Sequence, residues 1–269
     1  GLASIRARGV RGAWCWARGG GWRGPYLEHE DEVGINVYAF ARLLWDPRDD
    51  PARLAAEYGV LELGLAPGSK ALAQYVRVQM LSEEAVLVAR YIGVVIAKGH
   101  FKRGSGWTPD GNWTRDDQLG VDKVTPCAQS FYDFLKLDGT LAAGIAERER
   151  ALALWKELAA ESEKLVAAAP DNPRLAAIRT DVLYGQRLFD TANHTYIAGW
   201  SAYAWADGGK RDDELATRAR THLAAAREAW RDYTDRVTKL PGSATPYFEL
   251  GFSEEWTVIE NLLAASVAR

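Results

Sequence analysis

A single extended segment near the start of the chain is the feature that most limits how this sequence can fold. Val10 to Arg18 is typical of one short strand, in which Trp14 and Trp16 are two residues apart and share a face. Gly19-Gly20-Gly21 then turns the chain into an irregular segment, residues 22–32. Because one strand cannot form a sheet by itself, we expect its hydrogen-bonding neighbours outside this chain.

Helical signals dominate everything that follows. Residues 33–45 carry a one-sided apolar stripe that ends at Asp46-Pro47. Asp50-Pro51 supplies an N-cap and a first-turn proline for a second helix that ends near Leu63. The same kinds of signal predict about seven helices in all, the others at 70–97 (with Ser82 as a point where it could break), 141–169, 173–206, 213–239 and from Ser253 onward.

Composition and motifs exclude several classes of function. A net charge of −3 offers no basic face for nucleic acid, and no apolar run approaches the length of a membrane span. Cys15 and Cys127 form neither a zinc motif nor a disulfide framework, and no motif for a cofactor is present. There is no recognisable signal peptide, so localisation stays open between cytoplasmic and secreted. The start at Gly1 suggests a chain that was processed, truncated or cut from something longer.

Tryptophan and tyrosine are the preferred large apolar residues, at eleven each against one methionine. Their flat faces with polar edges suit sugar rings, although single tryptophans more often fill helix cores. One candidate substrate-binding set follows the strand and adds arginines that could hold a uronic acid carboxylate. It consists of Trp14, Trp16, Arg18, Trp22, Arg23 and Tyr26.

A second candidate set lies in residues 99–126, which lack helical periodicity. A stretch of this length is functional or disordered, and its aromatic residues argue against disorder, so we expect an ordered loop. Trp107 and Trp113 supply stacking faces and Arg115 a directional charge, a mixture typical of ligand-facing loops. The alternative is that both tryptophans only pin the loop to the helices.

A third set shares one predicted helix. Asp190 and His194 are four residues apart, so they are expected to lie on one face and to hydrogen-bond. A histidine of the core satisfied by Asp190 is the favoured interpretation, and proton abstraction from a uronic acid is the other. The set comprises Tyr184, Arg187, Asp190, His194, Tyr196, Trp200, Tyr203 and Trp205.

Residues 36–47, Asn-Val-Tyr-Ala-Phe-Ala-Arg-Leu-Leu-Trp-Asp-Pro, resemble the segment that follows the barrel in alpha-glucuronidases of glycoside hydrolase family 67. Weaker similarity covers residues 80–93, 112–117 and 119–123, so the resemblance spans roughly residues 10–130. It implies that residues 1–32 are the last strand and loop of a (β/α)8 barrel. It also implies that residues 33–269 form a mainly α, multi-helix C-terminal domain. The catalytic acid and base would then lie outside this chain, and no position here matches them.

The leading hypothesis is therefore the helical C-terminal part of a glycoside hydrolase that acts on polysaccharide-derived oligosaccharides. It would support the sugar cleft and dimerisation, with a uronic-acid-containing glycan and the upstream barrel domain as partners and no metal or cofactor. The alternatives are a helical polysaccharide lyase that uses Arg187, His194 and Tyr196, and a non-catalytic carbohydrate-binding or dimerisation module.

Overall fold

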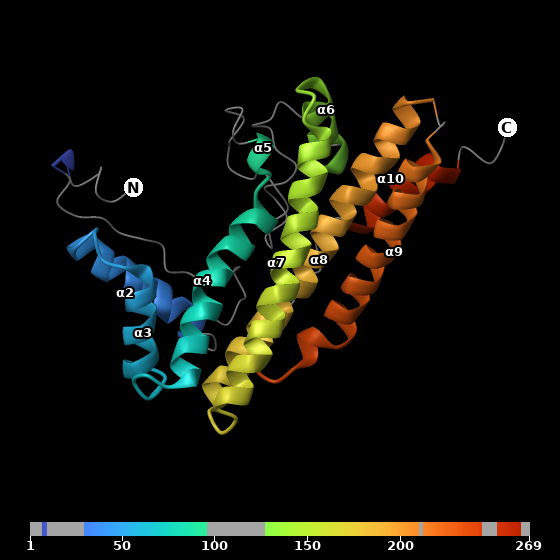
Figure 1. Ribbon diagram of the computed structural model, residues 1–269. Helices are drawn as coiled ribbons and strands as arrows, with labels where there is room; N and C mark the ends of the chain where they lie inside the picture. The colour runs from blue at the N-terminus through green and yellow to red at the C-terminus, as the bar shows by residue number, and fades with distance from the viewer. Residues whose placement is uncertain (1–6, 10–29, 96–126, 210–211, 244–251, 265–269) are drawn as a thin grey trace. The chain divides into compact units, whose positions relative to one another are not determined.

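The computed structural model describes residues 7–9, 30–95, 127–209, 212–243 and 252–264 (Figure 1). These residues are helical or lie in short connections, and no strand occurs among them, so the prediction of a mainly α chain is confirmed. The predicted strand at 10–18 and the predicted loop at 99–126 lie outside the described residues. The helices are α2 (Glu30–Trp45), α3 (Pro51–Leu61), α4 (Lys70–Arg90), α5 (Gly93–Val95), α6 (Cys127–Leu137), α7 (Leu141–Ala168), α8 (Pro173–Asp207), α9 (Asp213–Asp235), the 3-10 helix η4 (Val237–Lys239) and α10 (Phe252–Ala264).

The chain divides into two compact units. The first comprises residues 1–84, 157–184 and 240–245, and the second comprises residues 85–156, 185–239 and 246–269. Helices α4, α7 and α8 each contribute residues to both units. Among the residues described, no helix is both long enough and apolar enough to cross a membrane.

In the first unit, α2 packs on α3, and the start of α3 follows from local chemistry. The Asp50 side chain accepts a hydrogen bond from the Ala52 amide, and Pro51 occupies the first turn, where its missing N–H costs nothing. Tyr58 of α3 is buried under α2, where Gly34 leaves room for it, since a β-carbon there would lie 2.3 Å from the Tyr58 hydroxyl. Local capping and a small residue on the facing helix thus set this helix pair.

The remainder of the first unit joins the first part of α4 to the end of α7. Glu161 of α7 accepts a hydrogen bond from Gln74 at 2.6 Å and forms ion pairs with Arg77 at 3.0 Å and Lys164 at 2.7 Å. Hydrogen bonds from Lys164, Gln74 and Arg77, with the largest effect from Lys164, lower the pKa of Glu161 to about 2. A carboxylate that is 8% exposed is therefore kept charged and holds the two helices together.

In the second unit, α8 is the central helix. Trp200 of α8 is fully buried, and its indole N–H donates to the carbonyl of Ala128 in α6 at 3.0 Å. Gly199 lets the two backbones approach closely, because a β-carbon there would lie 2.8 Å from that of Ala128. The missing side chain of Gly199 and the small side chain of Ala128 explain why α6 and α8 pack closely at this level.

Some helix ends differ from the prediction. Helix α4 does not break at Ser82, whose hydroxyl donates to the Gln79 carbonyl within the helix, and α4 continues to Arg90. The helix predicted to reach Lys239 ends at Asp235 and is followed by the separate turn η4. Helix α6 was not predicted as a separate helix. The main pattern of long helices nevertheless holds.

Candidate functional site

The nine residues predicted to bind substrate lie outside the described residues. They are Trp14, Trp16, Arg18, Trp22, Arg23, Tyr26, Trp107, Trp113 and Arg115. The site that the structure does describe is built on α8 and its neighbours in the second unit, where the third predicted set falls.

The aromatic members of that third set are core residues. In the second unit, Trp200 is 0% exposed and Tyr196 is 1% exposed, with Tyr196 in edge-to-face contact with Phe131 at 5.7 Å between ring centroids. Trp205 and Tyr203 are also buried, as is Tyr184 in the first unit. These aromatic side chains therefore belong to the core, in line with the general expectation for single tryptophans.

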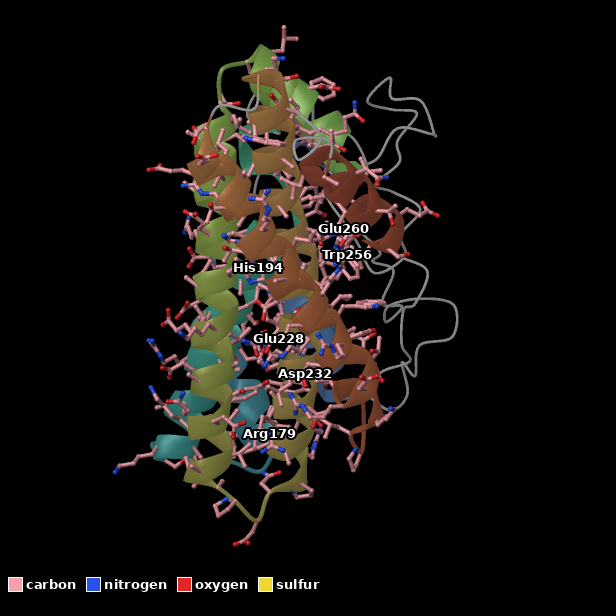
Figure 2. The ribbon with its side chains drawn as sticks, turned by 90° about the vertical axis from the view of Figure 1, so that its right-hand side faces the viewer. Arg179, His194, Glu228, Asp232, Trp256 and Glu260 are labelled. Atoms are coloured by element: carbon pink, nitrogen blue, oxygen red, sulfur yellow. The ribbon has the colours of Figure 1, made fainter. Side chains whose placement is uncertain are left out.

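The predicted partnership of Asp190 with His194 is wrong. The Asp190 carboxylate instead accepts from Arg187 at 3.3 Å, one turn earlier on α8. His194 contacts His222 of α9, with 2.8 Å between the two Nδ1 atoms (Figure 2 labels His194). Residues three or four positions apart on a helix share a face, so Asp190 could pair with either Arg187 or His194. The packing of α9 against α8 places His194 next to His222 instead.

The two imidazoles are both held toward the neutral form. Burial lowers the pKa of His194 to about 4, and the adjacent His222 acts in the same direction. Burial also lowers the pKa of His222, opposed by the charge of Glu149 on α7 and assisted by Arg218 on α9. At neutral pH the pair is therefore uncharged and can serve as both a proton donor and a proton acceptor.

His222 also borders a shallow, open groove along the first half of α9. The groove is lined by Asp213, Glu214, Thr217, Arg218, Thr221 and His222. His222 was not singled out from the sequence, although it borders the buried stripe of Ala216, Ala219, Leu223 and Ala226. One imidazole thus connects the surface of α9 with the interior of the second unit.

A second polar cluster ties α8 to the end of α9. Arg187 donates to Asp232 at 2.6 Å as well as to Asp190, and Asp232, which Figure 2 labels, also pairs with Arg236. The bonds from Arg236 and Arg187 lower the pKa of Asp232. Burial raises the pKa of Asp190 to about 6, against the opposing charge of Arg187. Two carboxylates on one guanidinium therefore differ strongly in acidity because only Asp190 is deeply buried.

A third cluster fixes the end of α4. Arg148 of α7 is fully buried and donates to the carbonyls of Ala89 at 3.1 Å and Tyr91 at 2.7 Å and to the Asn193 side chain at 2.9 Å. Carbonyls at a helix end lack partners within the helix, so the guanidinium caps α4. Arg148 occupies the buried stripe of α7 between Ile145 and Ala151. This interrupted apolar pattern is the sequence signal that could have identified it.

Glu147, the neighbour of Arg148, completes this junction. Its carboxylate accepts from the amides of Gly93 at 2.7 Å and Val94 at 3.3 Å, and it lies 3.0 Å from Arg148. A carboxylate at free backbone amides satisfies donors that would otherwise be unpaired. The two adjacent charged residues therefore hold the connection between α4 and α5 through hydrogen bonds to its backbone.

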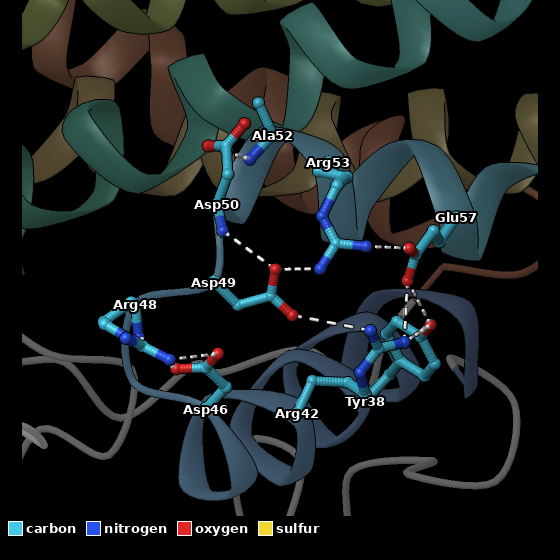
Figure 3. A network of polar contacts seen from close by, with 9 residues as sticks. All are labelled: Tyr38, Arg42, Asp46, Arg48, Asp49, Asp50, Ala52, Arg53 and Glu57. Atoms are coloured by element: carbon cyan, nitrogen blue, oxygen red, sulfur yellow. Dashed lines mark hydrogen bonds and ion pairs between the residues drawn. The ribbon is translucent and has the colours of Figure 1, made fainter.

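In the first unit, Tyr38 and Arg42 of the segment 36–47 belong to a separate polar network (Figure 3). Tyr38 donates to Glu57 of α3 at 2.9 Å, and Arg42 reaches the same carboxylate at 2.7 Å. Arg53 bonds both Glu57 and Asp49, and Asp49 also pairs with Arg42 at 3.4 Å. Two guanidiniums and two carboxylates are thus mutually neutralised, which locks α2 onto α3.

Within the residues described, no group of three histidine, cysteine, aspartate or glutamate side chains is arranged to hold a metal ion. Comparisons of the chain with protein-family models, with curated proteins and with solved structures find no match. The resemblance of residues 36–47 to family 67 therefore remains a prediction.

Proposed function

We propose that this chain is the helical part of a glycoside hydrolase of the alpha-glucuronidase type, acting on polysaccharide-derived oligosaccharides. Its role in this proposal is to support the sugar cleft and a dimer interface. A barrel domain outside these residues would supply the catalytic acid and base. Acidic oligosaccharides would be bound through the tryptophans and arginines of residues 14–26 and 107–115.

The proposal is carried by the structural role of the motif at residues 36–47, which joins two helices. Tyr38 and Arg42 of this motif both bind Glu57 and so close α2 onto α3. The polar residues of this motif thus join the first two long helices of the described chain. This is the role that the proposal requires of a segment at the start of a helical domain. Trp45 of the same motif is 85% exposed and offers a large apolar surface at the end of α2.

The hydrogen bonds of the titratable groups on α8 also favour a supporting role for this chain. Arg187 is bonded to two carboxylates, and His194 is bonded to His222. A lyase that used these groups with Tyr196 would need the phenol to reach the sugar. Tyr196 is 1% exposed and packed between Phe131 and Trp200, which argues against that chemistry.

The proposal is tested with the purified chain and a glucuronic-acid-bearing xylo-oligosaccharide. Isothermal titration is expected to show binding that is lost in Trp107→Ala or Trp113→Ala and kept in Trp45→Ala, the control for loss of one tryptophan. Chromatography of the same mixtures is expected to show no release of glucuronic acid. Turnover by the chain alone would refute the supporting role, and absence of binding to the wild-type chain would refute the sugar ligand.

A further inference from the structure

We infer that the His194–His222 pair is an acid-operated latch between α8 and α9. It is closed while the facing nitrogens share one proton and opens when each ring carries a positive charge. This inference concerns the helices of the second unit and does not rest on the proposed carbohydrate function.

The latch follows from the geometry of the contact. The two Nδ1 atoms are 2.8 Å apart, which is a hydrogen-bond distance between nitrogens. Only one hydrogen fits between them, so one ring has its proton on Nδ1 and the other has a lone pair there. The accepting ring must then carry its own proton on Nε2. The neutral pair is thus a donor and an acceptor in complementary tautomers.

Proton uptake by this pair has two distinct consequences. The first proton can go to Nε2 of the donor ring, which becomes an imidazolium and keeps the hydrogen bond. The second proton has to go to Nδ1 of the acceptor ring, where it takes the lone pair that holds the bond. Two imidazoliums then face each other with a hydrogen on each nitrogen, so the contact must break.

The charged groups around the pair determine how readily each ring takes up a proton. Glu149 from α7 favours a charge on His222, whereas Arg218, one turn earlier on α9, opposes it. On α8, Asp190 lies one turn before His194, but its carboxylate is committed to Arg187.

The opening is expected to be confined to the first half of α9. His222 joins that half to α8 through its contact with His194, and the groove residues from Asp213 to Thr221 precede it on the exposed side. The second half is held independently, by Arg227 with Glu260 of α10 at 2.6 Å and by Asp232 with Arg187 at 2.6 Å. Residues 213–223 should therefore loosen in acid while residues 226–235 stay packed.

Amide hydrogen exchange followed by mass spectrometry tests the latch, with rates corrected for their intrinsic pH dependence. Between pH 7 and about pH 4.5 we expect exchange over residues 213–223 to accelerate about tenfold beyond that over residues 226–235. In His222→Asn, which cannot take up a proton, this acceleration should disappear. Thr221→Asn, an exposed neighbour, should behave as the wild type. Equal exchange in both segments, or acceleration that persists in His222→Asn, would overturn the latch.

A measurement on the unmodified protein covers the case in which the variant does not fold. Long-range proton–nitrogen spectra report the protonation of each imidazole nitrogen. We expect the two rings to take up their protons in separate steps, with an Nδ1–H on one ring only in the neutral state. Two rings that titrate together near the ordinary value of about 6.5 would contradict a shared proton.

Discussion

The backbone of Gly185 in α8 runs directly against the indole of Trp155 in α7. A β-carbon at Gly185 would lie 2.5 Å from Cη2 of that ring and 2.7 Å from Cζ3. Trp155 is 4% exposed and stacked on Phe189 at 5.1 Å between centroids, so the ring has little room to move. Glycine is thus required here for close packing.

Gly185→Ala is therefore expected to destabilise the protein, although alanine normally favours a helix by about 1 kcal/mol. Overpacking a core costs about 1–3 kcal/mol, so we expect a net loss of up to about 2 kcal/mol in unfolding free energy. Denaturant unfolding measures this loss. In a Trp155→Leu background the same substitution should cost clearly less, and an equal cost in both backgrounds would show that the contact is not the cause.

Arg148→Met should be among the most damaging single changes in the second unit. Methionine keeps the aliphatic stem of the side chain but removes the guanidinium donor from the Tyr91 carbonyl, and it leaves the Ala89 carbonyl with only the 3.4 Å bond from Asn193. Loss of one partner from a buried charged network costs about 3–5 kcal/mol. Thermal unfolding should show a large drop for Arg148→Met and little change for Lys156→Met, an exposed residue of the same helix. Similar effects of the two substitutions would contradict the capping role.

The pKa of Asp190 implies a pH dependence of stability whose sign is opposite to that of most ion-paired carboxylates. Its pKa is raised to about 6 in the folded chain, above the ordinary 3.8, so the folded state retains the proton longer. Its contribution to stability is therefore complete below about pH 4 and is lost as the pH rises to about 6.

Asp190→Asn removes this dependence because the amide cannot ionise. Above about pH 6 the variant should be more stable than the wild type by about 1–3 kcal/mol, and near pH 4 the difference should vanish. Comparing both proteins at each pH cancels the contribution of His194. The control Asp235→Asn, exposed at the end of α9, should show no such pH-dependent gain. A variant that is less stable at neutral pH would show that the Arg187 pair outweighs burial.

The sequence predicted those helix starts that depend on neighbours within a few residues. Asp50 caps α3, as the Asp50-Pro51 pair indicated, and Asp212, next to the predicted start at residue 213, accepts from the amides of Glu214 and Leu215 at the start of α9. The end of α4 could not be predicted in the same way. It is fixed by Arg148, 59 residues from Ala89 in the chain, and only packing brings the two together.

The same difference between local contacts and contacts made by helix packing explains which parts of the candidate site were predicted. The spacing of Asp190 and His194 identified two residues of one helix face, but not the residue of another helix that each would meet. His194 pairs with His222, 28 residues away, because α9 packs on that side of α8. Periodicity defines which residues are buried, whereas the partners of buried polar groups depend on how the helices are placed around them.

A buried hydrogen bond between α8 and α10 gives a last prediction. The Trp256 indole N–H donates to the Thr195 hydroxyl at 2.9 Å, and Thr195 is fully buried. Thr195→Val keeps the shape but removes the acceptor, so the indole donor is left unpaired at a cost of about 1–3 kcal/mol. Thr257→Val makes the same change at an exposed position of α10, where water replaces the lost bond, and should have almost no effect in denaturant unfolding. Equal effects at the two threonines would mean that the change of residue type, rather than the bond to Trp256, sets the cost.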